Sequence, residues 1–132
     1  MGEEAKTVLV AGPLVEPRGT FEGFDLVLTD VMVERTRIRL DWPNEETMPD
    51  GTRHGGGKLV QLAHARQAVE RAAKENRVTH ALVFEEEVFE VMTEEAPAKL
   101  RAELVQVVAC ALRWIQDIDR RLAAPLVQGN TP

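Results

Sequence analysis

The chain has 132 residues, a length typical of one domain, and its 44% hydrophobic and 29% charged residues are typical of a globular protein with a buried core. Its net charge of −6 argues against a nucleic-acid polymer as partner, because contacts to many phosphates need clustered Lys and Arg. Cys110 is the one cysteine, which excludes an internal disulfide and favours a reducing, cytoplasmic setting.

Residues 1–23 are rich in Gly and Pro, and we expect them to form a poorly ordered or peripheral leader. Their apolar run, TVLVA, is interrupted by Gly12 and Pro13, and no basic region precedes it. We therefore expect neither a signal peptide nor a membrane anchor.

The pattern from residue 25 onward predicts helices. Apolar residues recur at helical spacing over residues 25–42, although LVL at 26–28 also fits a strand, and residues 43–57 are typical of a loop. A second helix is predicted over residues 58–76. Its expected inward residues are Leu59, Leu62, Ala63, Val69 and Ala73. Thr79 is the predicted N-cap of a helix over 80–95, and Pro97 suits the first turn of a last helix that ends near Ala124.

The last helix carries a regular apolar seam and would span ~39 Å. The seam consists of Leu100, Leu104, Val107, Val108, Ala111, Ile115, Ile118 and Leu122. A helix of this length in a chain of this size favours an all-α fold, an antiparallel bundle of about four helices over residues 24–124. Residues 125–132 are expected to form a flexible tail.

The sequence VFEEEVFEVM, residues 83–92, places four glutamates in an otherwise apolar segment. At about 100° per residue, Glu86, Glu87 and Glu90 share one stripe of the helix, whereas Glu85 points near the apolar side. A second stripe lies on the last helix and consists of Glu103, Gln106, Cys110, Arg113 and Asp117.

If the two helices pair in antiparallel fashion, side-chain oxygens of both stripes converge. Converging carboxylates repel one another, and a hard divalent cation such as Mg²⁺ neutralises them while it keeps waters that a phosphate can replace. A solvated acidic face is the alternative, but the same helix is apolar around most of its remaining circumference.

These residues resemble the EExxE…ExxD motif of the all-α MazG-like nucleoside triphosphate pyrophosphohydrolases. EEVFE (residues 86–90) is followed after twelve residues by ELVQ (residues 103–106). The similarity is closest to the small MazG-like proteins of actinobacteria and their phages, in which a Trp and then PDGT precede the helices. These elements are Trp42 and residues 49–52 here, and the resemblance covers roughly residues 30–121.

The resemblance implies hydrolysis of a (deoxy)nucleoside triphosphate to the monophosphate and pyrophosphate, with Mg²⁺, or alternatively Mn²⁺, as cofactor. Its metal ligands correspond to Glu87, Glu90, Glu103 and Gln106, and Glu86 would orient or activate the attacking water. It also implies a homodimer or homotetramer with the nucleotide between subunits. Gln106 stands where the family has an aspartate, so the rival expectation is a catalytically silent helical protein that binds a partner or a nucleotide.

Two further residues are candidates for substrate contact. Arg113 lies on the stripe of Glu103 and can bind phosphate or pair with Asp117 four residues on. Trp42 can stack on a base, although packing in the core or in a subunit interface is favoured. Cys110 has no base at a suitable spacing, so we do not expect it to be a nucleophile.

Overall fold

The computed structural model describes residues 21, 23–42 and 44–124, which contain four α-helices, one short 3₁₀ helix and no strand. The helices are α2 (Phe24–Asp41), α3 (Gly57–Lys74), α4 (His80–Thr93) and α5 (Pro97–Ala123), and the 3₁₀ helix η1 (Glu45–Thr47) follows α2. The predicted all-α fold is confirmed for these residues. The predicted leader, apart from residues 21 and 23, and the predicted tail at 125–132 lie outside them.

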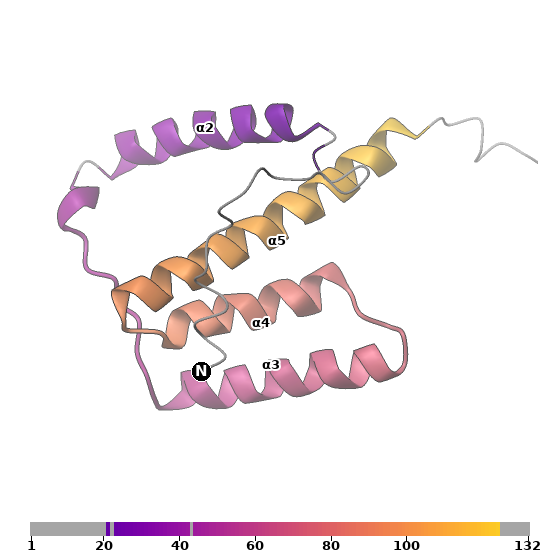
Figure 1. Ribbon diagram of the computed structural model, residues 1–132. Coiled ribbons are helices and arrows are strands. Elements are labelled where there is room, and N and C mark those ends of the chain that lie inside the picture. The colour runs from indigo at the N-terminus through magenta and orange to yellow at the C-terminus, as the bar shows by residue number, and fades with distance from the viewer. Residues whose placement is uncertain (1–20, 22, 43, 125–132) are drawn as a thin grey trace, which may run out of the picture.

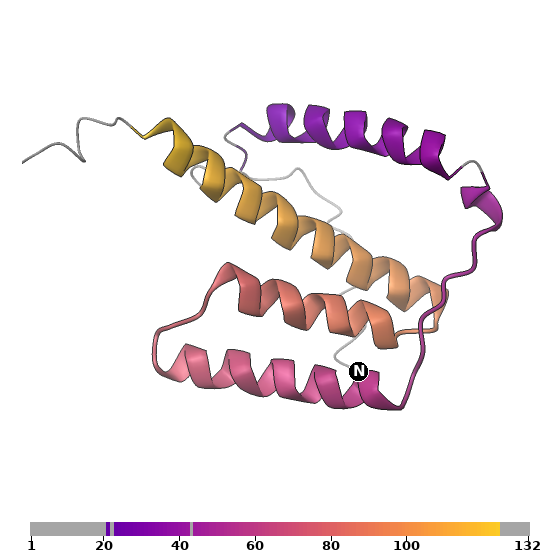
Figure 2. The ribbon, with the colours of Figure 1, turned by 180° about the vertical axis from the view of Figure 1, so that it is seen from behind.

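Helix α4 lies between α3 and α5, and the three run in alternating directions, whereas α2 lies on the other side of α5 (Figures 1 and 2). Contacts are extensive between α3 and α4 and between α4 and α5, and sparser between α2 and α5. Within the described part of the chain, no helix has the length and apolar character needed to cross a membrane.

Local sequence signals set the ends of the helices around the site. Thr79 Oγ1 accepts a hydrogen bond from the Leu82 N–H at 3.1 Å, which confirms Thr79 as the N-cap of α4. Pro97 occupies the first turn of α5, as predicted. Helix α3 ends two residues before the predicted boundary, because Asn76 is left-handed (φ 54°) and the Arg77 N–H closes the end by donating to the Ala72 carbonyl at 2.7 Å.

The buried face of α3 differs in part from the predicted one. Leu62 is buried as expected, but Ala63 and Ala73 are exposed, and the buried alanines are Ala65 and Ala72. Leu59 and Val69 are half-buried. The physical reason is that α3 packs mainly on α4, so its buried stripe is narrow and faces that single neighbour.

The apolar seam of α5 is only partly covered by the described residues. Leu100 is buried, and Val107 and Ala111 are half-buried. The exposed members of the seam are Leu104, Val108, Ile115, Ile118 and Leu122. Helix α2, whose one buried residue is Val27, leaves an apolar groove of about 380 Å³ against α5. A large apolar surface of α2 and α5 therefore faces solvent in the single chain.

Trp42 is the C-cap residue of α2. Its backbone N–H donates to the Ile38 carbonyl at 2.9 Å, and its backbone carbonyl accepts from the Glu45 N–H at 3.2 Å. The residue is 59% exposed, so it does not pack in the core of the single chain, and its packing in a subunit interface stays a prediction. Among the described residues, the last turn of α2 is joined to η1 by ion pairs of Arg39 with Glu45 and Glu46, and these exposed contacts leave the indole largely uncovered.

Candidate metal centre

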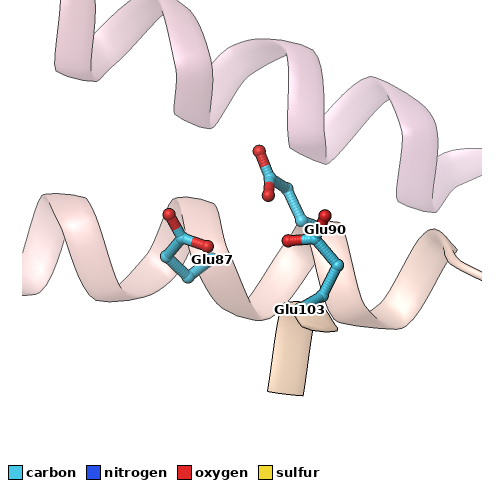
Figure 3. Close-up of side chains that lie close together, drawn as sticks. All are labelled: Glu87, Glu90 and Glu103. Carbon is cyan, nitrogen blue, oxygen red and sulfur yellow. The ribbon is translucent and has the colours of Figure 1, made fainter. Parts of the chain in front are cut away.

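Helices α4 and α5 bring Glu87, Glu90 and Glu103 together, and we call these three residues the acidic cluster (Figure 3). One carboxylate oxygen of each lies within 4.8 Å of the others. Glu87 and Glu90 are three residues apart on one face of α4, and Glu103 reaches them from α5. The connection between α4 and α5 is short, which makes the two helices antiparallel neighbours and sets these faces against each other.

The acidic cluster is withdrawn from water. All three residues are half-buried, the side chain of Glu90 is only 10% exposed, and atom Oε2 of Glu87 and of Glu103 is buried. The alternative of a solvated acidic face therefore does not describe these side chains. Carboxylates this close repel one another in a partly desolvated setting, and a positive charge placed among them relieves that repulsion.

The donor set suits a hard divalent cation. Within the described residues, the cluster supplies carboxylate oxygens from two helices and neither a histidine nor a cysteine. Such a set matches Mg²⁺ or Mn²⁺, which prefer oxygen ligands and fill their remaining positions with water or substrate phosphate.

A pocket of about 270 Å³ lies beside the acidic cluster and includes two of its members, Glu90 and Glu103. Its other charged or titratable lining groups are His54 from the loop before α3, Arg66 from α3 and Glu94 at the end of α4. Arg66 Nη2 lies 3.3 Å from Glu90 Oε1. The pocket thus presents both acidic and basic groups, as a site for a cation together with an anion requires.

The loop before α3 is fastened to the end of α4, next to this pocket. The Arg53 N–H donates to the Met92 carbonyl at 3.0 Å, and the Thr52 hydroxyl donates to the Glu94 carbonyl. Gly51 adopts a left-handed conformation (φ 76°) that favours glycine. The PDGT segment therefore turns the chain so that His54 reaches the pocket.

The predicted water-activating residue, Glu86, and the predicted fourth metal ligand, Gln106, are half-buried neighbours of the cluster along their helices. Glu86 directly precedes Glu87 on α4, and Gln106 follows Glu103 by three positions on α5. A separation of three residues places Gln106 on the same face of α5 as Glu103.

Cys110 lies close to the acidic groups of α4. Burial raises the pKa of the Cys110 thiol, and the charges of Glu87 and, to a lesser extent, Glu86 raise it further, whereas Arg113 acts in the opposite direction. The thiol therefore stays protonated near neutral pH and is a poor nucleophile, in agreement with the sequence-based expectation.

Arg113 is not among the residues that line the pocket beside the acidic cluster. It lines a second groove of about 430 Å³, which it shares with His80, Asp117 and Arg121. Asp117 lies 3.2 Å from His80 Nε2 and 3.5 Å from Arg121 Nε. Arg113 is ten residues beyond Glu103, a rise of roughly 15 Å along α5. Its contact with substrate stays a prediction.

Sequence reasoning missed Arg66 and His54. Arg66 follows Leu62 by four residues, so the two side chains share one face of α3. The helical spacing could therefore have identified Arg66 once Leu62 was known to face α4. His54 has no local signal, because only the hydrogen bonds of the loop to α4 bring it to the pocket.

Fold and site together define an all-helical protein with a partly buried carboxylate cluster between two antiparallel helices. Comparison with known protein families, with curated proteins and with solved structures gives no match.

Proposed function

We propose that the protein is a MazG-like nucleoside triphosphate pyrophosphohydrolase that depends on Mg²⁺. The observation that carries the proposal is the convergence of Glu87, Glu90 and Glu103 within 4.8 Å, since these are the carboxylates that the EExxE…ExxD spacing singles out. A partly buried, three-carboxylate donor set is compatible with Mg²⁺ or Mn²⁺.

Bound at this cluster, the cation supplies charge neutralisation for the phosphates of the substrate. The protein residues have separate roles in the proposal. Glu87, Glu90 and Glu103 hold the cation, and the amide oxygen of Gln106 is a fourth, uncharged ligand. Glu86 orients a water molecule and accepts its proton as water adds across the α–β phosphoanhydride bond, which yields the monophosphate and pyrophosphate.

The exposed apolar surface of α2 and α5 supports a homodimer or homotetramer as the working form of the enzyme. In such an assembly Trp42, exposed in the single chain, would pack at a subunit interface or stack on the base. Arg113 is a further candidate for contact with the phosphates of the substrate. The lone cysteine, Cys110, agrees with a cytoplasmic location.

The rival function is a catalytically silent helical protein that binds a nucleotide or a protein partner. It is favoured by Gln106, since an amide oxygen ligates Mg²⁺ but supplies no charge. Both functions share the fold, so metal binding and product formation distinguish them.

Calorimetry with Mg²⁺ and Mn²⁺, with and without a non-hydrolysable nucleoside triphosphate, is the decisive experiment. It is accompanied by product analysis after incubation with a panel of nucleoside and deoxynucleoside triphosphates. The proposed enzyme binds the cation, binds the triphosphate only with the cation, and releases pyrophosphate from at least one substrate. Binding of the cation and the nucleotide without release of pyrophosphate would establish the silent alternative. If the protein binds no cation, neither the enzyme nor a metal-dependent nucleotide-binding protein is supported.

A further inference from the structure

Arg66, on α3, is a cationic residue that contacts the acidic cluster. Its guanidinium contacts Glu90 through one nitrogen, Nη2, at 3.3 Å from Oε1. Strong charge-assisted pairs of arginine and carboxylate are shorter, about 2.7–2.9 Å, and often use two nitrogens. The side chain of Arg66 is 53% exposed, whereas that of Glu90 is 10% exposed. The contact is therefore weak and on the solvent side of a carboxylate that is otherwise enclosed.

We infer that Arg66 is a phosphate-binding residue that neutralises Glu90 until a metal ion takes its place. The inference rests on the proposed function. A divalent cation at the acidic cluster and the Arg66 guanidinium compete for the same carboxylate, because both are positive and Glu90 is a member of each contact. When the cation binds, it repels the guanidinium, and phosphate oxygens that bind the cation become the nearest negative groups for Arg66.

The groups that line the pocket indicate which part of the ligand contacts Arg66. Arg66 and His54 lie beside the carboxylates of Glu90, Glu94 and Glu103, so the pocket suits a polyphosphate that binds together with its cation. Inorganic tripolyphosphate is therefore an adequate probe, since it carries the phosphates without a base.

The inference predicts opposite effects of one substitution on two binding reactions. Arg66→Gln removes the competing charge, so Mn²⁺ alone binds more tightly, by about fivefold. The same variant loses the phosphate contact, so tripolyphosphate binds more weakly at saturating Mn²⁺, by about tenfold. Calorimetry measures both affinities on the full chain. Arg71→Gln is the matched control, because it makes the same change of charge on the same helix at an exposed residue outside this pocket.

The expected result is tighter Mn²⁺ binding and weaker tripolyphosphate binding in Arg66→Gln, with neither change in Arg71→Gln. Arg66→Lys keeps a charge near Glu90 but lacks the planar fork, so it should bind Mn²⁺ like the wild type and tripolyphosphate less well. If Arg66→Gln behaves like Arg71→Gln while the wild type binds Mn²⁺ and tripolyphosphate, the inference is wrong and the proposed function stands. Wild-type protein that binds no Mn²⁺ would overturn both.

Discussion

At the residue scale, Glu90 is the point at which the opposing charges of the site meet. It contacts Arg66 on one side and belongs to the acidic cluster on the other. We predict that Glu90→Gln weakens Mn²⁺ binding at least tenfold, about 1.4 kcal/mol, because a charged ligand is lost. The fold should remain intact or gain stability, since the variant removes repulsion from Glu87 and Glu103, whereas the pair with Arg66 that it weakens is long and has an exposed partner.

Mn²⁺ titration and thermal unfolding measure the two effects. Glu85→Gln is the control, because Glu85 is an exposed glutamate of the same helix outside the cluster. A Glu90→Gln protein that unfolds at room temperature, with wild-type Mn²⁺ affinity in the folded fraction, would show that the acidic cluster is structural.

Gln106 is the residue at which the chain departs from the MazG-like motif. If Gln106 completes the ligand set with Glu103, Gln106→Asp adds a carboxylate to the cation and should tighten Mg²⁺ binding by about tenfold and raise pyrophosphohydrolase activity. Most of the raw attraction is offset by desolvation and by repulsion among the acids, which keeps the net gain modest. Mg²⁺ calorimetry and pyrophosphate release test this. Weaker Mg²⁺ binding together with lost activity would show that the site is adapted to the amide.

Cys110 reports on the charge of Glu87. Because burial and then Glu87 raise the pKa of the thiol, Glu87→Gln should lower that pKa and move the pH profile of iodoacetamide alkylation to lower pH. The raised pKa of Cys110 also makes the free energy of unfolding depend on pH. The pKa is higher in the folded chain, so the unfolded chain loses the proton first, and the contribution of Cys110 to stability falls as pH rises through the ordinary thiol range. An alkylation profile that does not move in Glu87→Gln, as in the Glu85→Gln control, would contradict the assignment.

At the scale of the elements, the cap of α4 supports the site indirectly, since α4 carries Glu87 and Glu90. Thr79→Ala removes the acceptor of the Leu82 N–H and should cost about 1 kcal/mol of unfolding free energy. Thr36→Ala on α2 is the control, because it makes the same change in the middle of a helix. The Thr36 hydroxyl donates to the Met32 carbonyl, so its removal does not affect the N–H groups at a helix start. Urea unfolding of both variants measures the difference. Equal stability of the two proteins would show that the cap is not significant for α4.

The sequence predicts what is local and leaves open what depends on neighbours. Thr79 and Pro97 mark helix starts because capping chemistry acts within one turn. The convergence of the acidic cluster also follows from local facts, namely two stripes and a short connection that makes α4 and α5 antiparallel. The prediction of the inward face of α3 was partly wrong. Ala63 and Ala65 are equally apolar, and the position of α4 decides which of them is buried.

The basic side of the site was not predictable in the same way. Arg66 comes from α3 and His54 from the loop, and neither is close to the acidic cluster along the chain. Their placement depends on the packing of α3 on α4 and on the Arg53 and Thr52 hydrogen bonds to the end of α4. Hydrophobic periodicity specifies a face of one helix, but it does not specify which face of another helix it meets.

At the scale of the whole molecule, apolar surface exceeds what the described chain covers. The five buried apolar residues of the described part are Val27, Leu62, Ala65, Ala72 and Leu100. The exposed apolar residues are more numerous and include most of the seam of α5 and much of α2. Helix α4, although the most apolar in sequence, has mostly half-buried side chains. Exposed apolar surface on this scale is typical of an interface between protein chains.

We therefore predict that the isolated monomer is not stable and that folding is coupled to association with further copies of the chain. Dilution should then reduce both the sedimentation coefficient and the helical circular dichroism signal, because dissociation exposes apolar area whose burial is worth about 25 cal/mol per Å². Analytical ultracentrifugation and circular dichroism over the same range, from about 100 µM to below 1 µM, measure the two quantities together. The Thr79→Ala variant, with a weaker α4, should dissociate at a higher concentration than the wild type if folding and assembly are linked. A monomer that keeps its full helical signal below 1 µM would show that the exposed faces of α2 and α5 serve another partner or none.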